Sequence, residues 1–388
     1  MKSNTFVAIG DGSLAIGAAV RLGGSWVPSP GTGQSHELHA QEVDILGPSD
    51  AKTFPIQKKY QTPEYLRTMP HLRSRTPFNS ALLRLRSQVI GSLTQFYADR
   101  DFVQTQPPVI TSSDCEGAGE VFTVSPANEV PVPEGNSEKA ESFFRSPKYL
   151  TVSTQLHLEA LAQSVGNVWT LSPTFRAEKS DTSRHLSEFY MLEAEMSFVD
   201  DMVHVMNLLE DMLRHISTNL YESKVAQEIR WRGKGSSSDL APGDEVDGRW
   251  KGLMLPEWPR LTYTEAIDIL KEKEDLFEHT PVWGAGLQSE HEKYIAKVVG
   301  GGQKPVFVTH YPRDIKAFYM LPSQSPSGRS GADIQLPGTT VDCFDLLVPE
   351  FCEIAGGSMQ GAEGLDGSMS ADAQGGSLEC FFLLCGVR

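Results

Sequence analysis

The sequence predicts an α+β fold built on an antiparallel sheet, because its helical and strand patterns do not alternate regularly. Two long segments, about 76–96 and about 200–221, carry apolar residues at helical spacing. Shorter runs with strand character lie at 148–153, 168–178, 188–198, 305–310 and 341–348. No Gly-rich phosphate loop follows any of these runs, which disfavours a doubly wound parallel sheet.

Composition allows a substantial core and argues against several classes of protein. The 388 residues are 39% hydrophobic, enough for one large domain and a small one. No apolar run approaches the roughly 18 residues that span a bilayer. The formal net charge of -16 argues against a general nucleic-acid binder. The five cysteines form no Cys-x-x-Cys pair, so a disulfide framework and a zinc site are both disfavoured, and a reducing compartment fits best.

The first 50 residues are rich in Gly and β-forming residues. Their apolar runs at 6–9, 18–20 and 43–46 are split by Gly and Pro, which predicts a small barrel of short strands followed by a linker to about Arg75.

Basic residues gather between Lys52 and Arg86, where eight Lys and Arg stand against one acid, Glu64. This stretch is either a solvated linker and helix face or a track for phosphates. The eight residues are Lys52, Lys58, Lys59, Arg67, Arg73, Arg75, Arg84 and Arg86.

The first long helix is expected to begin after Thr76 as N-cap, with Pro77 at its first position. Two shorter helices are expected at capping boxes, Thr262 with Glu265 and Ser289 with Glu292. Pro, Gly and Ser predict loops at 125–142, 232–250 and 321–340, and a disordered chain from Gly356 onward.

The run from Phe189 to Phe198 reads as a strand with two unlike faces. Its period of two places Phe189, Glu193 and Glu195 on one face, with the two carboxylates about 7 Å apart, and apolar residues on the other. Such a pattern fits either a routine half-buried strand or a binding wall. Upstream, Arg176 and Glu178 share a face, where Arg suits phosphate and a carboxylate suits an exocyclic amine. An isolated Arg-x-Glu is also common as a cross-strand ion pair.

A cluster of acids surrounds a short apolar run near residue 347. An acid at a strand end, followed by another after a short turn, can collect Mg²⁺ beside substrate phosphates. Surface acids have the same spacing, so the pattern alone leaves both interpretations open. The four acids are Asp342, Asp345, Glu350 and Glu353.

In order, these segments resemble the asparaginyl-tRNA synthetases of class II. The entry to the catalytic domain is similar at 71–76 (HLRSRT), motif 1 at 108–120 (PVITSSDCEGAGE) and motif 2 at 175–189 (FRAEKSDTSRHLSEF). The match continues through FYM at 318–320, FDLLVP at 344–349 and EIAGGS at 353–358, so that it spans roughly 71–359.

The resemblance implies a class II catalytic domain at 76–358. It is preceded by an incomplete OB-type anticodon-binding barrel at 1–62 and a hinge at 63–75 that faces the tRNA backbone. By this resemblance Arg176 and Glu178 are catalytic, holding the ATP α-phosphate and the adenine amino group, with Phe189 stacked on adenine. Arg184 and His185 complete the ATP-binding set of motif 2.

Further roles follow from the same resemblance. Glu116, Ser153 and Gln155 would line the amino-acid pocket, with Glu193 and Glu195 on the same wall. Asp345 and Glu353 would bind Mg²⁺. The implied substrates are asparagine, ATP and tRNA(Asn), and the implied reaction forms asparaginyl-adenylate. The implied assembly is a homodimer, and no association with a membrane is expected.

The resemblance stops at residue 359. The family follows Gly-Gly-Ser-x with an Arg that grips the amino acid, whereas Gln360 stands here, and no motif 3 string exists in the 388 residues. We expect 359–388 to be an aberrant, disordered tail that lacks the family's next core strand. Little or no aminoacylation is therefore expected of this chain.

Two other functions remain open at this stage, an aspartyl-tRNA synthetase and a non-catalytic dimeric paralogue. The amino-acid sequences at 114–119 and 184–189 favour the asparaginyl branch. The bacterial-type start and the Pro/Ser-rich insertions favour a mitochondrial matrix location, with the cytoplasm as the alternative.

Overall fold

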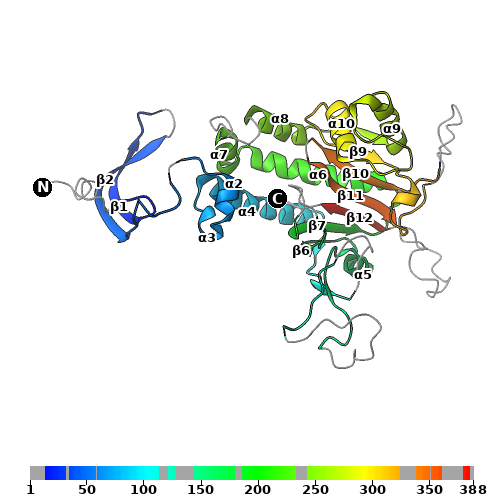
Figure 1. Cartoon of the computed structure of the whole chain (residues 1–388), viewed down its shortest axis with the longest axis horizontal. Coiled ribbons are helices and arrows are strands. Elements are labelled where there is room, and N and C mark those ends of the chain that lie inside the picture. Colours follow the sequence, from blue (N-terminus) through cyan, green and yellow to red (C-terminus); the bar gives the residue numbers. More distant parts are fainter. Residues whose placement is uncertain are drawn as a thin grey trace. The chain divides into compact units, whose positions relative to one another are not determined.

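The computed structural model describes most of the chain as two compact units, Met1–Arg84 and Leu85–Arg388 (Figure 1). Each unit is described by itself. The described residues are 14–31, 35–57, 59–112, 121–127, 143–179, 186–232, 243–323, 338–349, 351–360 and, for the backbone, 379–384.

The N-terminal unit contains a long antiparallel hairpin of β1 (Ala19–Pro28) and β2 (His36–Gly47). Near the end of the hairpin where β1 connects to β2, Trp26 stacks on His36, with ring centroids 6.0 Å apart. Two short helices follow, α2 (Pro63–Arg67) and α3 (Pro70–Arg73). The described residues of this unit contain one hairpin, so the incomplete OB-type barrel stays a prediction, and the apolar run at 6–9 lies outside them.

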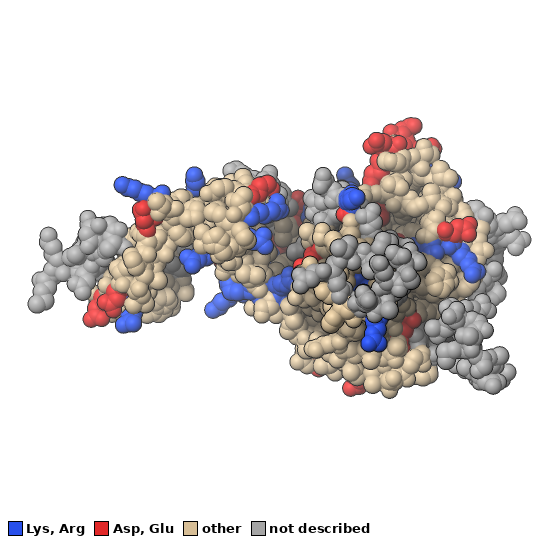
Figure 2. Space-filling model, turned by 60° about the horizontal axis from the view of Figure 1, so that its bottom comes forward, with Lys and Arg blue, Asp and Glu red and all other residues tan. Residues whose placement is uncertain are grey.

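The basic stretch between Lys52 and Arg86 also stays a prediction as a phosphate track. In the view of Figure 2, Lys and Arg side chains are spread over the N-terminal unit rather than gathered into one patch.

The C-terminal unit holds the large sheet and its covering helices. Its described elements, together with α4, which crosses the boundary between the units, are α4 (Pro77–Ala98), β3 (Val103–Gln104), β4 (Ile110–Thr111), β5 (Tyr149–Leu150), α5 (Gln155–Val165), β6 (Val168–Phe175), β7 (Glu188–Met196), α6 (Met202–Tyr221), α7 (Lys224–Arg232), α8 (Gly243–Met254), β8 (Arg260–Thr262), α9 (Tyr263–Lys271), η2 (Glu274–Leu276), α10 (Ser289–Val299), β9 (Val306–Thr309), η3 (Arg313–Ile315), β10 (Cys343–Val348), β11 (Cys352–Gln360) and β12 (Glu379–Leu384).

Eight strands form the sheet in the order β3-β6-β7-β12-β11-β10-β9-β8. All neighbours are antiparallel except β3 with β6 and β8 with β9. The predicted antiparallel α+β fold is therefore confirmed. None of the described helices is both long enough and apolar enough to cross a membrane.

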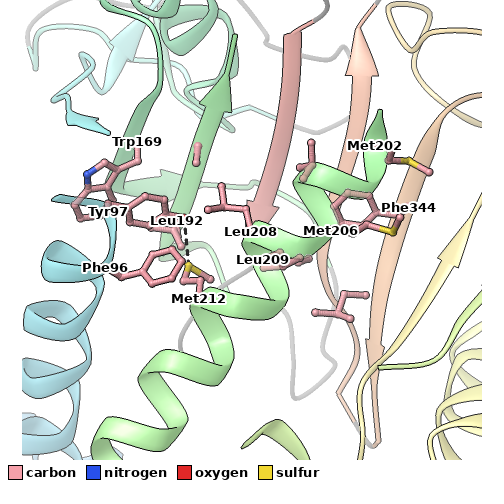
Figure 3. Close-up of a cluster of buried hydrophobic side chains, with 14 of the residues drawn as sticks. Phe96, Tyr97, Trp169, Leu192, Met202, Met206, Leu208, Leu209, Met212 and Phe344 are labelled. Atoms are coloured by element: carbon pink, nitrogen blue, oxygen red, sulfur yellow. Dashed lines mark hydrogen bonds between the residues drawn. The ribbon is translucent and has the colours of Figure 1, made fainter. Parts of the chain in front are cut away.

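One face of the sheet is packed against α6, and we call it the apolar face. Leu192 and Ala194 of β7 and Phe344 of β10 contact the buried side of α6 in one core cluster (Figure 3). Tyr97 of α4 joins them, stacked on Trp169 at 4.7 Å, and its hydroxyl donates to the sulfur of Met212 at 3.2 Å. This packing points alternate residues of the central strands away from α6.

Among the described residues, helices pack on the opposite face of the sheet at its two ends. At one end α9 and α10 pack on Val306, Val308 and Leu347, and at the other α5 contributes Leu158 to a small cluster with Val168. Between them lie polar residues of β7, β10 and β11, and we call this the polar face. Its members named below are Glu193, Glu195, Asp345, Glu353, Gly356 and Gln360.

Both predicted long helices are confirmed as α4 and α6, and the capping box of Thr262 and Glu265 opens α9 as predicted. The box predicted for Ser289 and Glu292 is displaced by one residue. The N-cap of α10 is Gln288, whose backbone N–H donates to Nδ1 of His291. The sequence rule names Ser and Glu, whereas Gln and His supply the same reciprocal bonds here.

Several predicted boundaries were wrong. The loop predicted at 232–250 contains most of α8, because Asp247 accepts hydrogen bonds from Tyr221 at 2.9 Å and Arg230 at 2.9 Å. These contacts override the weak helix propensity of a Gly- and Asp-containing segment. The strand predicted at 168–178 ends at Phe175, where the sequence turns polar. Helix α5 was not predicted.

The prediction of a disordered tail was also wrong for part of 359–388. Strand β11 continues through Met359 to Gln360, and β12 pairs on both sides, with β11 and with β7. Residues 380–385 are a short apolar run bounded by polar and Gly residues, which is typical of a central strand. The place between β7 and β11 is therefore filled by this chain's own residues. Residues 361–378 and 385–388 lie outside the described part.

Replacement of Phe382 by Pro is expected to destabilise the C-terminal unit strongly. Phe382 pairs with Gly357 on one side and with Ala194 on the other. Proline removes the backbone N–H and is not tolerated inside a sheet, so the loss is at least about 3 kcal/mol. Thermal unfolding followed by circular dichroism measures it. Phe382→Val, which keeps the N–H, is the control. Equal melting temperatures for Phe382→Pro and the parent chain would show that β12 is not part of the stable sheet.

Candidate active site

Three carboxylates and a glycine lie on the polar face, on strands β7, β10 and β11. The predicted alternation of β7 is correct, because Leu192 and Ala194 pack under α6 while Glu193 and Glu195 lie on the other side, both fully buried. Asp345 of β10 is 7% exposed and pairs with Gly356 of β11. A sheet interior holding this many acids calls for fixed partners, since an unpaired buried carboxylate is expensive.

Glu193 is held by the segment that leads into α5. One of its oxygens accepts from Ser153 Oγ at 2.6 Å and from the Thr154 backbone N–H at 2.9 Å. The Thr154 hydroxyl donates to the other oxygen. Ser153 and Glu193, predicted on one wall, are thus in direct contact. In this structure Glu193 fixes the 153–154 segment, and with it the start of α5 at Gln155.

Gln155 lies in a chain of polar side chains. Its amide nitrogen donates to Glu159 at 3.1 Å, and its amide oxygen accepts from the Tyr319 hydroxyl at 3.2 Å. Gln360 donates to the same oxygen of Glu159 at 3.1 Å. Burial raises the pKa of Glu159, while these two amides lower it. The residue that stands in the place of the family's Arg therefore reaches the Gln155 side chain through a shared carboxylate.

Arg176 and Phe189 are neighbours, with the guanidinium 5.7 Å from the ring centroid. The backbone N–H of Arg176 donates to the Ser187 carbonyl at 3.2 Å, which extends the pairing of β6 and β7 one residue beyond the strand end. Glu178 lies past that end and is exposed. The predicted face shared by Arg176 and Glu178 on one strand is therefore not formed, because β6 ends at Phe175.

Asp345 and Glu353 approach the same point above Gly356. A Cβ at Gly356 would lie 3.2 Å from Oε1 of Glu353 and 3.4 Å from Oδ1 of Asp345, so the missing side chain leaves room where both carboxylates meet. The register of β10 and β11 shifts between Leu346 and Leu347, and Glu353 pairs with Leu347. Asp342, from the same predicted acid cluster, lies 3.6 Å from His310 instead, and Glu350 is outside the described residues.

The charges around this carboxylate pair favour a cation. Desolvation, and then repulsion by Asp345, raise the pKa of Glu353 to about 8, while Lys316 and Arg176 lower it. The Lys316 ammonium stands as a cation on Asp345, 2.9 Å from each oxygen. Burial lowers the pKa of Lys316, but Asp345, Cys343 and Glu353 together outweigh this and the net shift is upward.

Two hard oxygen donors fit Mg²⁺, which is commonly held by one or two carboxylates together with substrate phosphates. No group of three or more His, Cys, Asp or Glu among the described residues makes a metal site alone, so the remaining ligands would come from substrate or water. The predicted residues Glu116, Arg184 and His185 lie outside the described part of the chain.

Comparisons with known proteins identify the family of this chain. The model of the tRNA synthetases class II (D, K and N) matches residues 62–366. The mitochondrial asparagine–tRNA ligase of Saccharomyces cerevisiae is 43% identical over 350 residues, covering 87% of this chain and 67% of that protein. The chain belongs to the class II tRNA synthetases, in their asparaginyl branch.

Other relatives of this class II synthetase extend the match. The human asparaginyl-tRNA synthetase is 40% identical, over 89% of this chain and 68% of its own length. The crystal structure of the Pyrococcus horikoshii asparaginyl-tRNA synthetase, complexed with asparaginyl-adenylate, superposes with a TM-score of 0.73 at 26% identity. It covers 98% of this chain and 80% of that one.

Three contacting residues of the synthetase site were not found by reasoning from sequence. Glu159 lies one turn after Gln155, so a prediction of α5 would have placed both on one helix face. Tyr319 lies in the FYM string that carries the resemblance, without a role assigned to it. Lys316 is a single Lys after a short helical turn, and no local pattern marks it.

Replacement of Glu193 by Gln is expected to destabilise the synthetase by about 1–3 kcal/mol, because an amide presents a donor where three donors now meet a carboxylate. Denaturant unfolding measures this loss. Glu265→Gln at the exposed start of α9 is the control, and a smaller loss is expected there. An unchanged unfolding midpoint for Glu193→Gln would contradict the role given to the contacts with Ser153 and Thr154.

Proposed function

We propose that this chain is an asparagine–tRNA ligase, which joins asparagine to tRNA(Asn) with ATP through asparaginyl-adenylate. One observation carries the proposal. Glu193, which holds Ser153 and Thr154, lies on the same polar face of the sheet as Asp345 and Glu353. Arg176 is close enough to Glu353 to lower the pKa of that carboxyl. Relatives 40–43% identical over most of the chain are named for this reaction.

Arg176 and Phe189 form the proposed nucleotide end. An adenine ring would stack on Phe189, and the adjacent guanidinium would hold the α-phosphate, for which a planar Arg is better suited than Lys. Glu178, exposed just beyond the end of β6, is proposed to accept from the adenine amino group. Arg184 and His185 of motif 2 are proposed for the same nucleotide.

Ser153, Gln155 and Glu116 form the proposed amino-acid end, with Glu193 and Glu195 behind them. The Gln155 amide is already oriented by Glu159 and Tyr319, so it presents its remaining donor and acceptor capacity in a fixed direction. A neutral amide and a carboxylate together suit a ligand with an ammonium group and a side-chain amide. They suit a second carboxylate less well, because Glu159 would repel it.

Asp345 and Glu353 are proposed to hold Mg²⁺, which when bound supplies positive charge to the phosphates of ATP. The chain's own residues position the reactants. The asparagine carboxylate attacks the α-phosphorus and pyrophosphate leaves. The 3′-hydroxyl of the terminal tRNA adenosine then attacks the acyl carbon, and AMP leaves as the ester forms. Arg176 stabilises the charge that develops on the α-phosphate. Catalysis therefore depends on orientation and electrostatics more than on proton transfer.

Binding of a sulfamoyl analogue of asparaginyl-adenylate, measured by calorimetry, tests the proposal without requiring turnover. The asparaginyl analogue is expected to bind at least about tenfold more tightly than the aspartyl analogue, a difference of about 1.4 kcal/mol. Arg176→Ala should weaken binding by a further factor of about ten or more, since a charged donor at the bridging group is lost. Arg67→Ala, in an exposed ion pair with Glu64, is the matched control.

Two results of this experiment would count against parts of the proposal. Equal binding of both analogues would contradict the asparaginyl assignment and favour an aspartyl enzyme. A folded protein that binds neither would favour the non-catalytic paralogue. In the same preparation, asparagine-dependent pyrophosphate exchange is expected to be low because Gln360 replaces an Arg, and near-normal turnover would overturn that expectation.

Assembly, anticodon recognition and location are further proposals. We propose a homodimer through the motif 1 segment, where Ile110 is 44% exposed, and sedimentation velocity would detect a monomer. The N-terminal unit is proposed to bind the anticodon. Two fungal relatives, 43% and 41% identical, are mitochondrial by name, which supports a matrix location. Fractionation with matrix and cytosolic markers decides between matrix and cytoplasm.

A further inference from the structure

Lys316 is held tightly against the proposed metal pair although no assigned role requires it. Its ammonium lies 2.9 Å from both oxygens of Asp345 and 4.1 Å from the centroid of the Tyr311 ring. The side chains of Lys316 and Asp345 are 20% and 10% exposed. A bidentate ion pair over an aromatic face with so little solvent is a strong local arrangement.

The same Asp345 oxygens are those proposed to bind Mg²⁺. A bound Mg²⁺ lies about 2.0–2.1 Å from its oxygen ligands. An ammonium that contacts both oxygens of one carboxylate occupies that position, and two cations on one carboxylate also repel each other. Lys316 and a divalent cation therefore compete for Asp345.

We propose that Lys316 is the resident cation of the Asp345–Glu353 pair and that a divalent cation binds there only when the Lys316 ammonium leaves. This inference rests on the metal role of the two acids in the proposed function. Lys316 follows the short turn η3 and carries a flexible four-carbon stem, so the ammonium can move without movement of β10. The Tyr311 ring and Gly356 bound the position that it vacates.

The competition has a consequence for the order of loading. A metal ion that arrives alone must displace an ion pair, and it brings no anion to accept the freed ammonium. A metal ion that arrives on a nucleotide brings phosphates, which can accept the released ammonium. The chain would therefore bind free divalent cations weakly and take them up together with ATP.

Binding of Mn²⁺ alone, followed by the electron paramagnetic resonance signal of the free ion, tests the competition. In Lys316→Met the Mn²⁺ dissociation constant should fall about tenfold or more, since the competing cation is removed. Lys316→Arg, which keeps a cation on Asp345, should stay within about threefold of the parent chain. Lys304→Met is the matched control, because Lys304 donates only to backbone carbonyls. Unchanged or weaker Mn²⁺ binding by Lys316→Met would overturn the proposal.

A measurement on the unmutated chain avoids any effect on folding. Lysine acetylation mapped by mass spectrometry should increase at Lys316 when Mg²⁺ is added to saturation, while Lys304 stays unchanged. No increase at Lys316 would also overturn the proposal. Neither experiment contains ATP, asparagine or tRNA. A failure here is thus distinguishable from a failure of the ligase assignment, which the adenylate analogues test.

Discussion

The apolar packing between α6 and one face of the sheet is the constraint on which the site depends. Once Leu192, Ala194 and Phe344 are committed to that contact, the pleat of each strand directs the residues between them to the other side. The direction of the Glu193 and Asp345 side chains is therefore set by hydrophobic burial on the opposite face of the sheet. The direction of these carboxylates does not depend on a contact that they make themselves.

Carboxylates aimed in this way must still be stabilised, and the polar face does so with partners of different kinds. Glu193 takes backbone and hydroxyl donors, Glu159 takes two amides, and Asp345 takes an ammonium. Neutral donors fix geometry without adding charge, which suits a pocket that selects an amino acid. The ammonium on Asp345 adds a positive charge, as the proposed exchange with a divalent cation requires.

Much of this arrangement could be predicted from the sequence because the strand period of two is a local property. The face that Glu193 and Glu195 share followed from β7 alone, and the family resemblance added Ser153, Gln155, Asp345 and Glu353. Contacts between distant segments could not be found in this way. Asp247 stabilises a helix through Tyr221 and Arg230, which lie 26 and 17 residues away.

The C-terminal strand and Lys316 are two further cases in which contacts between distant segments could not be predicted from local sequence. Residues 380–385 form only a short apolar run, and its position between β7 and β11 is decided by vacant backbone hydrogen bonds on both neighbours rather than by its own pattern. Lys316 reaches Asp345 across 29 residues. Local sequence patterns carry no information on such a pairing, although they predicted the strand on which Asp345 lies.

The register shift between β10 and β11 decides which way Glu353 points. Ile354 and Ala355 both lie against the α6 cluster, as expected where two residues oppose the single Leu346. With strict alternation Glu353 would be opposite Val348 and would lie under α6, where an unpaired charge is costly. The one additional residue places Glu353 on the same face as Asp345, so that both acids lie close to Gly356. In this hairpin, the number of residues in β11 therefore decides which face Glu353 takes.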